Sequence, residues 1–169
     1  VNGGSLDQQL LKKLIDADLK KPEKEQIGAN QVFLEAMIQS AIVSTQRALD
    51  LGMRKDQIII STKMSGVQEM VYCYTQLAER TEQPLHLGVT EAGTLLTGTV
   101  KSAIGMGILL YEGIGDTIRV SLTGDPVNEI GVAKGILKSL GLKQEGLNLV
   151  SCPSCGRMEL NGFEEMAKT

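Results

Sequence analysis

The sequence predicts an α/β protein built around parallel strands, and two observations carry this prediction. First, segments typical of strands alternate with segments typical of helices from residue 57 to residue 151. Second, Ile58, Ile59 and Ile60 form a continuous β-branched run, which is typical of a parallel strand buried on both faces. Strand–helix alternation of this kind indicates parallel strands joined by right-handed crossovers.

Four helices are expected from capping residues and apolar stripes, over residues 30–51, 67–77, 97–110 and 126–140. Asn30 is the expected N-cap of the first helix. Ser65 begins the second, because Gln68 three residues later completes a capping-box spacing. Asp125 before Pro126 begins the last helix. The expected apolar stripe of the second helix is Val67, Met70, Val71, Tyr74 and Leu77, and that of the last is Ile130, Ala133, Leu137 and Leu140.

The intervening segments are expected to be strands, over residues 57–63, 84–89, 117–122 and 147–151. The charge-rich stretch 12–25 is expected to be a solvated connector or a frayed helix. A complete (β/α)₈ barrel needs roughly 250 residues, and this chain has 169. The pattern alone therefore leaves open a small open sheet or a piece of a barrel.

Composition excludes several classes of function. The net charge is −3 and aromatic residues make up 3% of the chain, so it lacks the basic excess and the stacking platforms of a nucleic-acid-binding protein. The longest apolar stretch, residues 103–111, is too short to cross a bilayer. Three cysteines and no visible secretory leader indicate a reducing, cytoplasmic compartment.

Polar residues gather where the expected strands end. Alternation places Arg119 and Ser121 on one face of their strand, and Ser61 and Lys63 on one face of theirs. If these strands are neighbours, two cations and two hydroxyls meet at one edge, an arrangement that suits a phosphate or diphosphate. The alternative is a structural ion pair between Arg119 or Lys63 and Glu91, and the pattern leaves both open.

Other chemistry-bearing residues have simpler interpretations. Glu91 is a candidate general acid, although a glutamate at a strand end is as often a capping or pairing residue. His86, the only histidine, is expected to be a hydrogen-bonded packing residue. Cys73 is expected to be inert and half-buried in its helix. The segment 105–107, Gly-Met-Gly, lies inside a helix, so close helix packing explains it better than a dinucleotide site.

Cys152 and Cys155 form a CxxC pair directly after the last expected strand. Two thiolates at this spacing can hold a metal or two irons of one cluster, or act as a redox pair. Zinc and cubane clusters need further ligands, which do not follow before Thr169. Two buried small residues at a turn remain the alternative.

Taken together, five segments resemble the 4-hydroxy-3-methylbut-2-enyl diphosphate synthases, the iron–sulfur enzymes of the methylerythritol phosphate route to isoprenoids. The resemblance runs from Val1 to about Arg157. The segments are residues 1–6 (VNGGSL), 85–93 (LHLGVTEAG), 100–105 (VKSAIG), 112–122 (EGIGDTIRVSL) and 151–155 (SCPSC).

The resemblance implies a fold. The family has an N-terminal TIM barrel followed by a domain that holds a [4Fe-4S] cluster. On that template residues 1–141 are the C-terminal half of the barrel, from the end of strand five to the last helix. Residues 142–169 are the start of the iron–sulfur domain, so the chain is expected to be a fragment.

The resemblance also implies site residues and a reaction. The substrate is 2-C-methyl-D-erythritol 2,4-cyclodiphosphate, and two electrons from ferredoxin or flavodoxin pass through the cluster as the ring opens and water leaves. The implied roles are diphosphate binding for Lys63, Arg119, Ser121 and Asn2, acid catalysis for Glu91, and cluster ligation for Cys152 and Cys155.

The competing interpretations are a non-catalytic half-barrel, or another phosphate-binding barrel with a redox CxxC. The chain alone is not expected to turn over substrate, because half of the pocket and the remaining cluster ligands would be absent. Strands at the cut edges would expose unpaired backbone groups, so a homo-oligomer is expected.

Overall fold

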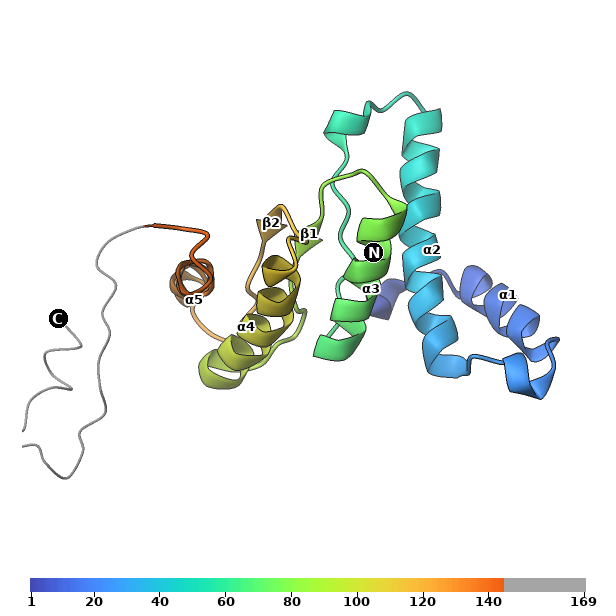
Figure 1. Cartoon of the computed structure of the whole chain (residues 1–169), viewed down its shortest axis with the longest axis horizontal. Helices are drawn as coiled ribbons and strands as arrows, with labels where there is room; N and C mark the ends of the chain where they lie inside the picture. The colour runs from blue at the N-terminus through green and yellow to red at the C-terminus, as the bar shows by residue number, and fades with distance from the viewer. Residues whose placement is uncertain (145–169) are drawn as a thin grey trace, which may run out of the picture.

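The computed structural model describes residues 1–144 (Figure 1). This part of the chain contains five α-helices and short parallel β-pairings. The helices are α1 (Gln8–Leu19), α2 (Ala29–Asp50), α3 (Val67–Arg80), α4 (Leu95–Tyr111) and α5 (Val127–Ser139), and the strands are β1 (His86–Leu87) and β2 (Thr117–Ile118).

The β segments form a row of parallel neighbours. β1 pairs with β2 in parallel, with His86 opposite Thr117. Isolated parallel bridges extend this row on the other side of β1, joining Ile60 to Leu85, Met64 to Val89, and Asn2 to Lys63. The predicted α/β class and parallel pairing are therefore confirmed, whereas the half-barrel stays a prediction.

The strand predicted over residues 57–63 is wrong in its extent and in its burial. Lys55–Gln57 form a 3₁₀ helix, and the segment after it makes only isolated bridges. Ile60 is buried, but 59% of the surface of Ile59 is exposed. Ile58 and Ile60 pack into the core on the face of the row that the helices cover, whereas Ile59 lies on the opposite face. The β-branched run predicted to be buried on both faces is therefore buried on one.

The core lies between that covered face and helices α2, α3 and α4. From the row it receives Ile60, Met64, Leu87, Val89 and Val120. The helices contribute fully buried side chains, among them Met37, Ile38, Met70, Tyr74, Leu77, Met106 and Leu109. This packing bears out most of the stripe predicted for the second helix.

The prediction of a solvated connector or frayed helix over residues 12–25 is right about exposure, since every charged residue there except Asp18 is exposed, but wrong about the structure of its first part. Most of it belongs to α1, which packs against α2 (Figure 1). The carboxylate of Asp18 is buried, forms an ion pair with Lys21 at 3.2 Å, and accepts hydrogen bonds from the backbone N–H groups of Ile27 and Gly28. These bonds fix the turn between α1 and α2, which a local charge pattern does not reveal.

The helix caps also differ from prediction. α2 begins after Gly28, whose φ of +83° favours glycine, and not after Asn30. α3 begins after Gly66, without the side-chain cap expected from Ser65. In α5 the predicted apolar stripe is wrong at Ile130, which is 60% exposed. The buried residue of that helix is Ile136, which was not part of the predicted stripe.

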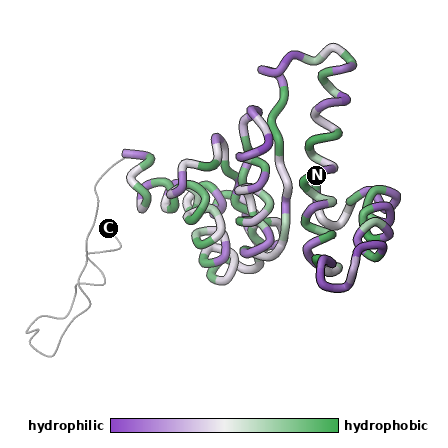
Figure 2. Tube along the Cα trace, turned by 45° about the vertical axis from the view of Figure 1, so that its right-hand side comes forward, coloured by the Kyte–Doolittle hydropathy of each residue, from purple (hydrophilic) through white to green (hydrophobic). Residues whose placement is uncertain are grey.

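No helix within residues 1–144 has the length and apolarity needed to span a membrane. In the longest helix, α2, hydrophilic residues interrupt the hydrophobic ones (Figure 2). The strand predicted at 147–151 and the Cys152–Cys155 pair lie outside the described residues.

Candidate functional site

The candidate site residues follow the carboxyl ends of the parallel segments. Lys63 lies near the end of the segment that pairs with residues 85–89, Glu91 follows that second segment, and Arg119 follows β2. Because parallel segments end at the same edge, the topology brings these positions to one edge. Val1–Gly3 joins the row beside Lys63, whose backbone N–H donates to the carbonyl of Val1 at 3.0 Å.

Lys63 and Arg119 lie close enough to repel one another. Burial lowers the pKa of the Lys63 ammonium group, and the positive charge of Arg119 lowers it further. No ion pair within residues 1–144 involves either cation, and two cations held near each other favour an anion between them. Burial alternates next to Arg119 as predicted, since Arg119 is exposed and Val120 is 2% exposed.

A close backbone contact places Arg119. Its N–H donates to the carbonyl of Leu87 at 2.9 Å. A Cβ atom on Gly88 would lie 2.7 Å from the carbonyl oxygen of Arg119, so only glycine fits at this position without a shift. The glycine therefore lets the two segments approach where the arginine leaves the sheet.

His86 lies beside the candidate site, a position that the sequence analysis did not predict. It is half-buried, and its Nδ1 lies 2.8 Å from Oγ1 of Thr117, so the predicted hydrogen-bonded role is confirmed. It also faces the cation pair: burial lowers the pKa of its imidazole, and the charges of Lys63 and Arg119 lower it further. Alternation along the strand could have predicted this position. Leu85 and Leu87 are buried, so His86 between them lies on the opposite face of the row, the face away from the core.

The alternative ion pair with Glu91 is not formed within residues 1–144. The four ion pairs of this part of the chain involve neither Lys63, Glu91 nor Arg119. Glu91 is exposed, at a turn where its φ of +50° is unusual for a residue other than glycine. Ser121 is half-buried two residues beyond Arg119.

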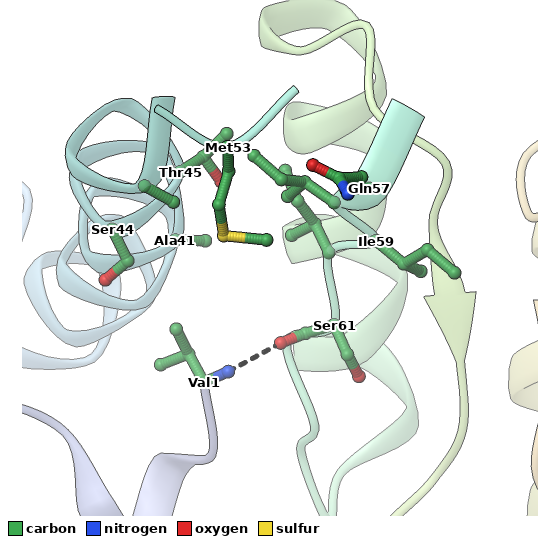
Figure 3. Close-up of a pocket in the computed structure, with 11 residues that line it drawn as sticks. Val1, Ala41, Ser44, Thr45, Met53, Gln57, Ile59 and Ser61 are labelled. Carbon is green, nitrogen blue, oxygen red and sulfur yellow. Dashed lines mark hydrogen bonds between the residues drawn. The ribbon is translucent and has the colours of Figure 1, made fainter. Parts of the chain in front are cut away.

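A separate pocket of about 270 Å³ lies between α2 and residues 57–61 (Figure 3). Its wall is mainly apolar and includes Met53 and Ile59. Val1 and Ser61 also line it, and the amino group of Val1 donates a hydrogen bond of 2.7 Å to the carbonyl of Ser61. The pocket does not include Lys63 or Arg119, so it is separate from the cation pair.

The described residues do not fit an iron–sulfur cluster. Within residues 1–144 no three metal-binding side chains gather. Cys73 is fully buried, rather than half-buried as predicted, and burial raises the pKa of its thiol to about 12, with Glu35 and Glu69 adding to the effect. A thiol that holds its proton so strongly is unsuited to ligating iron.

Comparison with known proteins gives a consistent assignment. Residues 1–134 match the GcpE family, in its TIM-barrel domain. The chain is 50% identical over 161 residues to a protein of Geobacter sulfurreducens named 4-hydroxy-3-methylbut-2-en-1-yl diphosphate synthase (flavodoxin). The match covers 95% of this chain and 41% of that relative, so the chain spans less than half of the relative's length.

Proposed function

The chain belongs to the GcpE family, and from this premise we propose that it is part of a 4-hydroxy-3-methylbut-2-enyl diphosphate synthase. The proposed substrate is 2-C-methyl-D-erythritol 2,4-cyclodiphosphate. The name of the Geobacter sulfurreducens relative favours flavodoxin over ferredoxin as the electron donor. The observation that carries the proposal is the meeting of Lys63 and Arg119 at the carboxyl edge of the parallel row.

The diphosphate would bind between these two cations. Arg119 offers paired N–H donors that match two phosphate oxygens, and Lys63 offers a point charge. Asn2 is bridged to Lys63 and Ser121 follows Arg119, so both lie near enough in the row to add polar contacts. Glu91, at the same edge, would act as the acid near the leaving hydroxyl.

A [4Fe-4S] cluster would supply the two electrons of the reaction when it is bound. The resemblance gives Cys152 and Cys155 as two of its ligands, and both lie outside the described residues. The roles proposed for residues 1–144 are therefore to bind the diphosphate, to orient it and to hold a proton at Glu91.

Inorganic pyrophosphate and the single histidine provide a direct test. We expect the pKa of His86, measured by NMR titration of its imidazole, to rise when pyrophosphate binds, because the anion offsets the charges of Lys63 and Arg119 that lower it. Lys63→Met and Arg119→Met should each raise the pKa of His86 in the free chain and weaken its response to pyrophosphate.

Lys12→Met is the matched control, since it removes the same charge from the exposed surface of α1. It should leave both the pKa of His86 and the pyrophosphate response unchanged. A histidine that titrates identically with and without saturating pyrophosphate would contradict the proposed site.

A further inference from the structure

The hydroxyl group of Tyr74 lies inside the parallel row rather than beside it. Tyr74 comes from α3 and is fully buried. Its hydroxyl donates to the carbonyl of His86 at 2.6 Å and accepts from the backbone N–H of Thr62 at 3.2 Å. A third contact, 3.3 Å long, joins it to Oγ of Ser61. One phenol therefore binds both neighbouring segments.

This hydroxyl takes the place of a ladder hydrogen bond. The N–H of Ile60 donates to the carbonyl of Pro84 at 2.9 Å, and the N–H of His86 donates to the carbonyl of Ile60 at 2.8 Å. In an evenly spaced parallel ladder the next donor and acceptor are the N–H of Thr62 and the carbonyl of His86. Both bind Tyr74 instead, and the bridge that this register places between Thr62 and Leu87 is missing.

The ladder resumes at Met64. The N–H of Thr90 donates to the carbonyl of Met64 at 3.0 Å, and Met64 is bridged to Val89. Between these two points no backbone hydrogen bond joins the two described segments, and the hydroxyl of Tyr74 bridges them there. Lys63 lies within that stretch. Local breaks in a ladder beside a site commonly re-aim a side chain.

We propose that Tyr74 is a positioning residue, whose inserted hydroxyl sets the spacing between Lys63 and the strand that carries His86 and so fits the edge to a diphosphate. This inference rests on the proposed function for its ligand and on the hydrogen bonds alone for its geometry. Tyrosine suits the role because its hydroxyl both donates and accepts. Burial raises the pKa of Tyr74, so the donated proton stays in place.

The experiment compares Tyr74→Phe with Tyr72→Phe, the same chemical change on the same helix at a half-buried residue. Without the hydroxyl the N–H of Thr62 can bond directly to the carbonyl of His86, which draws Lys63 toward the imidazole. We expect the pKa of His86 in the anion-free chain to fall further and the dissociation constant of inorganic pyrophosphate to rise by at least about fivefold. Tyr72→Phe should change neither quantity.

A stabilised background keeps the test decisive if Tyr74→Phe alone unfolds. Gly131→Ala in α5 supplies that background away from the site, because a Cβ atom there meets nothing within 4 Å and alanine favours the helix. The same measurements are then made on Gly131→Ala with and without Tyr74→Phe.

The two readouts separate the inference from the proposed function. A folded Tyr74→Phe chain with an unchanged pKa of His86 overturns the positioning role, whether or not pyrophosphate binds. A parent chain that does not respond to pyrophosphate overturns the proposed ligand, while a changed pKa of His86 in Tyr74→Phe still supports the spacing role.

Discussion

Replacing Gly98 with alanine tests whether close packing against α4 holds the loop that carries Glu91. A Cβ atom at this position would lie 2.5 Å from Cδ2 of Leu122 and 2.9 Å from the carbonyl oxygen of Gly93. The leucine side chain can rotate, but the carbonyl of Gly93 already accepts a hydrogen bond of 2.9 Å from the N–H of Thr123. The new methyl group therefore has to displace backbone in this loop.

Two opposing effects set the magnitude. Alanine in a helix is more favourable than glycine by about 0.5–1 kcal/mol, whereas overpacking a close-packed site costs about 1–3 kcal/mol. We expect Gly98→Ala to lower the free energy of unfolding by about 1–2 kcal/mol, measured by urea denaturation followed by circular dichroism.

Gly131→Ala in α5 is the control that lacks the packing effect, because a Cβ atom there meets nothing within 4 Å. It carries the helix preference alone and should raise the free energy of unfolding by about 0.5–1 kcal/mol. Equal stabilisation by both substitutions would refute the packing argument, since it would mean that the loop yields to the added methyl group without cost.

Two further predictions concern the thiol of Cys73 and the surface of α4. In a chain carrying Cys152→Ser and Cys155→Ser, the buried thiol, with its pKa of about 12, should react with a disulfide reagent at pH 8 only after urea unfolds the chain; rapid reaction of the folded chain would show that burial is incomplete. The chain should also self-associate at micromolar concentration in light scattering, because an apolar stripe on α4 is exposed, and a monomer at all concentrations would contradict this. The stripe consists of Leu96, Val100, Ile104, Ile108 and Tyr111.

The sequence by itself determined the class of fold and most of the candidate site. Strand–helix alternation predicted the parallel pairing that the structure shows. Period-two alternation predicted an outward Arg119 beside an inward Val120. These features are predictable because the side-chain direction along a strand depends only on local backbone geometry. Motif order added the family, which the match over residues 1–134 confirms.

Only the tertiary structure decided which groups become neighbours. From the sequence, His86 is a packing residue. Pairing with β2 on one side and with residues 60–64 on the other brings it beside the charges of Arg119 and Lys63. The sequence shows Tyr74 as one member of an apolar stripe. In the structure its hydroxyl replaces a ladder hydrogen bond between Thr62 and His86, each 12 residues from it along the chain. The buried Asp18 likewise depends on backbone donors in the following turn. Each of these contacts joins groups that are separated along the chain, and such pairs are fixed by packing rather than by the local pattern of residues.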